Sequence, residues 1–159
     1  MMEEIVVQEG HSVGLFKIGM HKEEVEQIIA YYIKNYGIYD NSFFFEYDED
    51  GKVTFIHLII EELKSQFQCK FKGIDIFNTM ASELTEIFEN LTPYIKDLDA
   101  ALGFCYDYPE LGLKFWRGQL CTQEDLEADW FKELELEIQE DYKRFLYFET
   151  VTFYEPIQK

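Results

Sequence analysis

The chain has 159 residues, of which 47% are hydrophobic and 29% are charged, so it can bury a core and is not expected to be disordered. Its 32 Asp and Glu residues against 14 Lys and Arg residues give a formal net charge of −18. This balance argues against a general DNA- or RNA-binding surface and against a basic helix on an anionic membrane, because both require clustered cations. If charge guides association, the partner is expected to be basic.

The N-terminal sequence and the cysteines predict a cytoplasmic protein. Met1 to Glu4 is acidic and lacks the basic region and apolar run of a signal peptide, and no stretch reaches the roughly eighteen apolar residues of a membrane span. Cys69, Cys105 and Cys121 are odd in number and widely spaced, which indicates free thiols in a reducing compartment. The three histidines show no metal-ligand spacing, so no metal and no cofactor are expected.

In chain order, the first half alternates short strands with one helix. Val25 and Tyr32 belong to an apolar set at helical spacing, and Gly37 is placed to end that helix. Residues 48–51 end in Asp-Gly, a hairpin signal because both residues tolerate a positive φ. The patterns predict a strand at 5–7, a helix at 22–35, strands at 42–47 and 53–58, and a further strand at 66–71.

The second half is predicted to repeat this order. A helix at 79–91 is expected to be capped by Asn78 or Thr79 and to stop before Pro93. The remaining expected elements are strands at 102–108 and 111–116, a helix at 122–144, and a strongly β-prone strand at 145–154.

A shift of 59 positions supports an internal repeat. Without a gap, it makes seven of thirty-five positions identical where about two are expected by chance. The alternative is coincidence between two amphipathic helices that are each followed by a hairpin. We therefore predict one domain over residues 1–159, with pseudo-repeat units at about 10–72 and 73–155 and a helical insertion at about 122–144. The expected class is α+β: two tandem helix-plus-β-hairpin units forming a mostly antiparallel sheet with helices on one face.

The insertion has two contrasting rows of side chains. A predicted capping box, Thr122 with Asp125, begins the helix. One row is apolar and recurs every four residues, and it is expected to pack on the domain: Leu126, Trp130, Leu134, Ile138 and Tyr142. The other row consists only of like charges: Asp129, Glu133, Glu137 and Asp141.

The acidic row admits two interpretations. Like charges four residues apart oppose a helix by about 0.2–0.5 kcal/mol per pair, and residues 124–141 hold nine acidic residues and one basic residue, Lys132. The row is either a solvated face or a docking surface for a cationic partner. Trp130, beside the row, and Trp116, at the end of a strand, are candidate interface anchors, although Trp116 also fits a core position.

The sequence offers little support for catalysis. It contains no phosphate-binding Gly-rich loop, no Gly-x-Ser-x-Gly elbow and no His-Glu-x-x-His motif. Asp97 and Asp99 lie in a loop without an evident acid–base partner, whereas His57 and Cys105 lie in predicted strands. A non-enzymatic protein is therefore favoured over an enzyme with a carboxylate site around Asp97, Asp99 or Asp107.

A succession of short motifs runs through residues 10–155: Ser12-Val13-Gly14, Ile18-Gly19-Met20, Glu24-Val25, Phe45-Glu46-Tyr47-Asp48-Glu49, Gly51-Lys52-Val53, Phe71-Lys72-Gly73, Ile76-Phe77, Glu83-Leu84, Glu110-Leu111-Gly112-Leu113 and Trp116-Arg117. This succession resembles small acidic bacterial proteins, some of which look like immunity partners of polymorphic or contact-dependent toxins. The Gly-Met-x-x-x-Glu-Val stretch is also similar to the unit of small outer-membrane assembly lipoproteins and to the tandem units of the β-lactamase inhibitor protein. These likenesses imply a curved sheet suited to embracing a partner.

The expected function is that of an immunity protein which occludes a cognate, basic bacterial toxin. Its predicted contact residues are Asp129, Glu133, Glu137, Asp141, Trp130 and Trp116. No nucleic acid or membrane is expected as a partner. One alternative is a small-molecule or peptide sensor that uses the aromatic sheet as its pocket. Another is a homodimer formed through the sheet edge.

Overall fold

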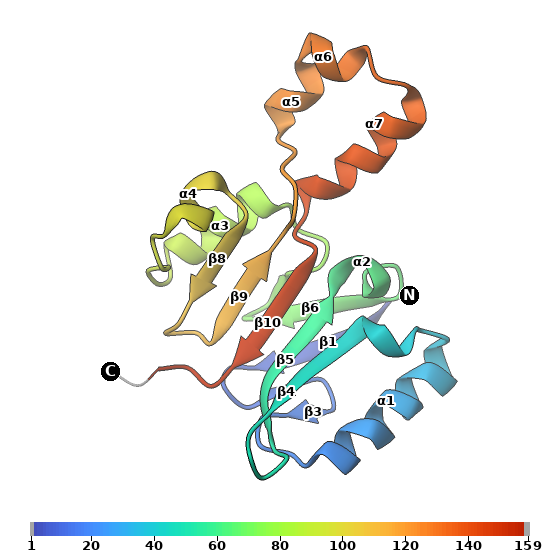
Figure 1. Cartoon of the computed structure of the whole chain (residues 1–159), viewed down its shortest axis with the longest axis vertical. Helices are drawn as coiled ribbons and strands as arrows, with labels where there is room; N and C mark the ends of the chain where they lie inside the picture. The colour runs from blue at the N-terminus through green and yellow to red at the C-terminus, as the bar shows by residue number, and fades with distance from the viewer. Residues whose placement is uncertain (1, 158–159) are drawn as a thin grey trace.

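The computed structural model describes residues 2–157, and Figure 1 shows its elements. The strands are β1 (Glu3–Gln8), β2 (Ser12–Val13), β3 (Phe16–Lys17), β4 (Phe43–Tyr47), β5 (Val53–Ile59), β6 (Phe67–Phe71), β7 (Ile74–Asp75), β8 (Cys105–Tyr108), β9 (Leu113–Trp116) and β10 (Thr150–Tyr154). The α-helices are α1 (Lys22–Tyr36), α2 (Ile60–Leu63), α3 (Ala81–Glu89), α4 (Leu98–Leu102), α5 (Gln123–Glu127), α6 (Asp129–Lys132) and α7 (Leu136–Lys143), and the 3-10 helices are η1 (Asp40–Ser42) and η2 (Arg144–Leu146). Within residues 2–157, each helix is too short or too polar to cross a lipid bilayer.

The strands form two five-stranded sheets, so the α+β class is confirmed. One sheet has the order β3-β2-β1-β6-β7, and its β1–β6 pair is parallel. The other has the order β4-β5-β10-β9-β8, is antiparallel, and carries β10 at its centre between two hairpins. The strands thus divide between two sheets rather than the single sheet expected from the sequence. Ten strands in one open sheet would present more apolar face than two longer helices could cover, whereas two sheets also bury one another.

The first long helix packs against both sheets. Tyr32 of α1 places its ring centroid 5.2 Å from Phe43 of β4 and 5.9 Å from Phe67 of β6. The helix ends at Gly37 in the left-handed conformation, whose N–H donates to the carbonyl of Ile33, as the sequence predicts. Burial of the Val25–Tyr32 face thereby fixes the position of α1 between the two sheets.

The second long helix repeats this arrangement on the other side of the core. Phe88 of α3 lies 5.6 Å, centroid to centroid, from Phe71 of β6 and 5.6 Å from Phe115 of β9. The order hairpin, helix, hairpin occurs twice along the chain, first in β2–β5 and then in β6–β9. The 59-residue shift aligns Gly14 with Gly73, and both adopt a positive φ in the turn of the hairpin that precedes the helix.

Local signals predict some features well and miss others. The 48–51 hairpin turn is confirmed, with Gly51 at φ +77°. The expected cap of α3 is wrong, because its N-cap is Met80 without a side-chain hydrogen bond. Thr79 Oγ1 instead donates to the carbonyl of Asp75 at 2.6 Å, and Asn78 Nδ2 donates to the carboxylate of Asp75 at 2.9 Å. Both side chains therefore stabilise the turn that precedes the helix.

The insertion is helical, but it is not the single helix expected over 122–144. Its chain breaks at Ala128 and Glu135, which both take an extended conformation at ψ 144° and 149°. The amide of Gln139 donates to the carbonyls of Lys132 and Leu134 at 3.3 and 2.8 Å, so it satisfies acceptors freed by the second break. Figure 1 shows the resulting α5–α7 module extending away from the sheets.

Aromatic packing explains why the insertion folds back on itself. Phe131 of α6 is buried, and its ring centroid lies 6.1 Å from that of Tyr142 on α7. Tyr142 also contacts Trp130 at 5.8 Å and Phe145 at 6.1 Å. A straight helix would spread these rings along its axis and would keep the acidic row in register. These four aromatic residues thus form a small nucleus inside the insertion rather than part of one stripe against the domain.

Candidate functional site

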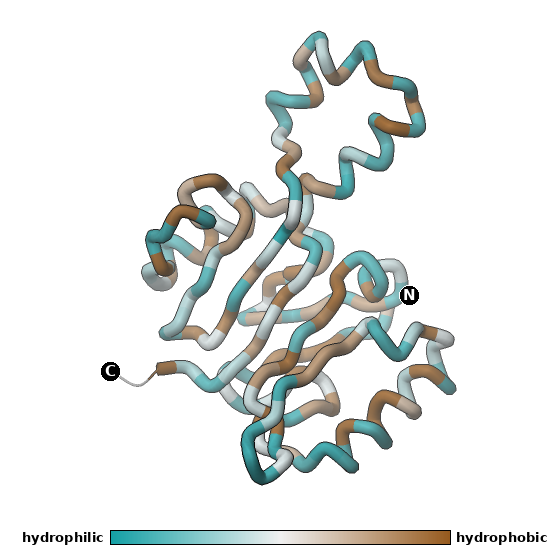
Figure 2. The backbone as a smooth tube through the Cα atoms, in the orientation of Figure 1, coloured by the Kyte–Doolittle hydropathy of each residue, from teal (hydrophilic) through white to brown (hydrophobic). Residues whose placement is uncertain are grey.

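The insertion carries an acidic surface with exposed apolar side chains. Figure 2 shows its backbone mostly in the hydrophilic colour, interrupted by hydrophobic positions. Three large apolar side chains are notably accessible: Trp130 at 46%, Leu136 at 77% and Ile138 at 48%. Three exposed carboxylates accompany them: Asp129, Glu133 and Glu137. We name these six residues the insertion surface.

The carboxylates of the insertion differ in how far they are neutralised. Lys132 Nζ lies 3.5 Å from Glu127, and Lys143 Nζ lies 2.9 Å from Glu140. Arg144 lies 3.7 Å from Asp141. The three carboxylates of the insertion surface form no ion pair with any residue in the described range 2–157. Together with Glu124 and Glu135, which are also exposed and are in no ion pair within this range, they are the charges of the insertion most available to a cationic partner.

The predicted contact residues consequently separate into three groups. Asp129, Trp130, Glu133 and Glu137 share the insertion surface, although the helix breaks place them on two helices instead of one row. Asp141 lies on α7 and is paired with Arg144. Trp116 belongs to β9 in the main body, where it is 44% exposed and thus not a core residue.

Trp116 is part of a second exposed surface, the outer face of the β4-β5-β10-β9-β8 sheet. The register sets Phe44, His57, Thr152, Lys114 and Asp107 in one row across all five strands. Their neighbours along the chain point to the opposite face and are largely buried, including Leu58, Val151 and Phe115. Alternation along each strand thus leaves aromatic, charged and polar side chains together on the uncovered side.

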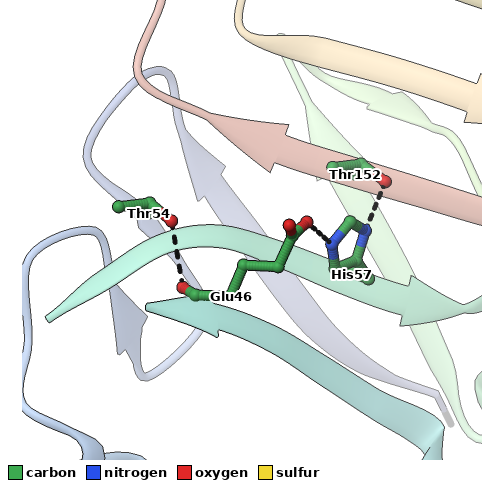
Figure 3. A network of polar contacts seen from close by, with 4 residues as sticks. All are labelled: Glu46, Thr54, His57 and Thr152. Atoms are coloured by element: carbon green, nitrogen blue, oxygen red, sulfur yellow. Dashed lines mark hydrogen bonds and ion pairs between the residues drawn. The ribbon is translucent and has the colours of Figure 1, made fainter. Parts of the chain in front are cut away.

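A polar network crosses the outer face, as Figure 3 shows. His57 Nδ1 lies 2.7 Å from Thr152 Oγ1, and His57 Nε2 lies 2.7 Å from Glu46 Oε2. Thr54 Oγ1 donates to the backbone carbonyl of Glu46 at 3.1 Å. The rings of Phe55 and His57 stack at an interplanar angle of 11°. The imidazole is therefore held through both of its ring nitrogens.

The order carboxylate, imidazole, hydroxyl is also that of a nucleophilic triad, but the surroundings do not suit one. Thr152 is buried within the central strand, and none of the described cavities includes its side chain. A nucleophile needs an accessible oxygen and donors for the developing oxyanion. The network is better understood as a device that holds three strands and the Glu46 carboxylate in place.

Among the remaining candidates for chemistry, Asp97 has a structural role and the cysteine thiols are poor nucleophiles. Asp97 caps α4, where its side chain accepts from the Ala100 N–H at 2.9 Å. Burial raises the pKa of the Cys69, Cys105 and Cys121 thiols, which keeps them in the protonated, weakly nucleophilic form. Within residues 2–157, no three His, Cys, Asp or Glu side chains gather in a way that could hold a metal ion.

Sequence reasoning missed one feature of the main body. Arg117 is a buried cation, and it lines a cavity of about 320 Å³ where the insertion joins the sheet. Its partners lie 14 and 28 residues away along the chain, so no local pattern reveals them.

Comparison of the chain with protein-family models, curated proteins and solved structures finds no match. The resemblance to immunity-type proteins accordingly remains a prediction.

Proposed function

We propose that the protein is a non-enzymatic binding module for a basic protein, and specifically a cytoplasmic immunity protein that neutralises a toxin by covering its active surface. The insertion surface is the observation that carries this proposal. It combines three carboxylates that have no ion-pair partner among the described residues with three accessible apolar side chains on a module that extends from the body.

Electrostatics and apolar burial would have separate parts in such a complex. Unpaired surface carboxylates steer a cationic partner and raise its association rate. Carboxylates that stay exposed to solvent add little to the affinity of the complex. A long residence time must therefore come from apolar side chains that become buried at the interface. Trp130 and Leu136 supply such anchors beside the carboxylates. Many toxins that act on nucleic acid need a basic surface of their own, and an acidic inhibitor matches it.

Neutralising the insertion surface is expected to release the partner. Asp129→Asn, Glu133→Gln and Glu137→Gln together remove three charges without deleting side-chain volume. In a pull-down from native lysate at low ionic strength, the wild-type protein should retain one basic protein that elutes with salt, and the triple variant should retain at least about tenfold less. Co-expression should then suppress the toxicity of that protein.

A matched control distinguishes the effect of losing the insertion carboxylates from the effect of a smaller total negative charge. Glu24→Gln, Glu26→Gln and Glu62→Gln change the net charge equally at exposed positions on α1 and α2. This variant should retain the partner like the wild type. Leu136→Ser tests the apolar contribution, because this exposed side chain does not belong to the aromatic nucleus. Equal loss of the partner protein by the two triple variants, or full retention of the partner by both, would contradict the proposal.

A further inference from the structure

Arg117 is a buried cation that has no carboxylate partner among residues 2–157. Its residue is 8% exposed, and within residues 2–157 no Asp or Glu oxygen comes within ion-pair distance of it. Burying an unpaired charge is costly, and buried arginines are ordinarily paired. The absence of a partner is notable in a chain with 32 carboxylates.

The hydrogen bonds of Arg117 leave Nη2 of its guanidinium unused. Nε donates to the carbonyl of Gly103 at 3.0 Å, and Nη1 donates to the carbonyl of Phe145 at 2.8 Å. The guanidinium carbon lies 5.4 Å from the ring centroid of Phe148. Nη2 has no hydrogen bond to a described residue, but it is not an enclosed atom either, so it borders accessible space.

The accessible space beside Arg117 is the cavity of about 320 Å³. Its size is at the lower end of the range for small-molecule sites. The wall combines hydroxyl and amide groups with apolar surface and one carboxylate, and its residues are Ser82, Arg117, Cys121, Thr122, Gln123, Glu124 and Leu146. A guanidinium nitrogen that is free to donate in such a cavity is suited to a carboxylate oxygen, with which it forms a charge-assisted hydrogen bond.

The second charge in the wall narrows the class of ligand. Glu124 would repel a dianionic phosphate group, and one arginine supplies too little positive charge to offset this repulsion. The carboxylate of Glu124 would instead attract an ammonium group. We propose that the cavity binds a small zwitterion of the α-amino acid class, with its carboxylate on Arg117 and its amino group towards Glu124. Because a zwitterion carries no net charge, the net charge of −18 on the protein does not repel it.

Electrostatics and topology agree with this assignment. Burial lowers the pKa of the Arg117 guanidinium, so a bound carboxylate would restore the stability of its charged form. The cavity wall includes residues 121–124, where the chain enters the insertion, and Leu146, where it returns. Arg117 also holds the carbonyl of Phe145 on the returning segment. A ligand in this place therefore contacts both connections of the insertion to the body.

Thermal unfolding with defined probes tests the proposal. The probes are the twenty standard amino acids one at a time, then the deamino and decarboxy analogues of the strongest amino acid, and inorganic phosphate. At about a hundredfold excess over its Kd, one or more amino acids should raise the Tm of the wild-type protein by about 5 °C or more. The decarboxy analogue and phosphate should leave the Tm unchanged, and the deamino analogue should bind at least about tenfold more weakly.

Two substitutions test whether the ligand binds in this cavity. If one variant fails to fold, the other still gives the answer. Arg117→Gln should abolish the shift, and Ser82→Phe, at an exposed position of the cavity wall, should abolish it by filling the space. Glu83→Phe is the matched control, because this exposed neighbour does not line the cavity, and its shift should equal that of the wild type. No shift with any amino acid, a shift that persists in both cavity variants, or stabilisation by phosphate alone would overturn the proposal.

Discussion

Replacing Phe115 by alanine is expected to lower the free energy of unfolding by about 3–5 kcal/mol. Phe115 is fully buried on β9 and joins three parts of the core. Its ring stacks on Phe148 with centroids 4.9 Å apart, and it contacts Phe88 of α3 at 5.6 Å and Tyr108 of β8 at 6.3 Å. Removing the ring leaves a cavity that stiff aromatic neighbours cannot fill.

Equilibrium unfolding in urea measures this loss as a lower midpoint at an unchanged m-value. Phe44→Ala is the matched control, since the same side chain on β4 faces outward and is half-exposed. The control should lose less than about 1 kcal/mol. Similar losses for the two variants would mean that the inner and outer faces of the sheet are assigned incorrectly.

Gly112→Ala is expected to cost about 2–5 kcal/mol, because two penalties coincide at this turn. Gly112 has φ +62°, a region that alanine occupies at a cost. A Cβ built there would lie 2.0 Å from the carbonyl oxygen of Tyr154, so the backbone of β9 or β10 must move. That movement would disturb the hydrogen bond from the Tyr154 N–H to the Gly112 carbonyl, 3.0 Å long.

Gly73→Ala isolates the conformational part of this penalty. Gly73 has φ +81°, but its added Cβ would meet no atom of the described residues within 4 Å. We expect a loss of about 1–2 kcal/mol for Gly73→Ala and a clearly larger loss for Gly112→Ala in the same urea titration. Equal losses would contradict the close approach of β10 to the 112 turn.

The sequence predicts those elements whose signals are local. The 48–51 turn has its own chemistry, since Asp48 Oδ1 accepts from the N–H groups of Asp50 and Lys52 at 2.9 and 3.0 Å. Helix α1 likewise has an apolar face and a glycine at its end. Such features form from neighbouring residues, so a pattern in the sequence is sufficient to find them.

Features decided by distant contacts were not predictable in this way. The parallel pairing of β1 with β6 joins residues about sixty positions apart, and it assigns these strands to a separate sheet. The aromatic nucleus of the insertion outweighs the four-residue spacing that indicates one long helix. The last strand begins at Thr150 rather than at 145, because Phe145 lies in η2, where its carbonyl accepts from Arg117.

The candidate site likewise includes residues that the sequence identifies and residues that it does not. The sequence identifies the acidic residues and Trp130, because composition alone marks the segment. It does not separate Asp141, which Arg144 neutralises, from Glu137, which has no ion pair among the described residues. It also omits Leu136, whose exposure follows from the break at Glu135.

Contact of the insertion surface with a basic partner is tested most directly by the association rate of the recovered partner as a function of ionic strength. The rate for the wild-type protein should fall steeply as salt rises, because screening weakens the attraction. The Asp129→Asn, Glu133→Gln, Glu137→Gln variant should associate more slowly at low salt and with a shallower dependence, whereas the α1–α2 control variant should match the wild type. An unchanged rate and an unchanged salt dependence in the insertion variant would contradict this assignment and would place the partner elsewhere on the protein.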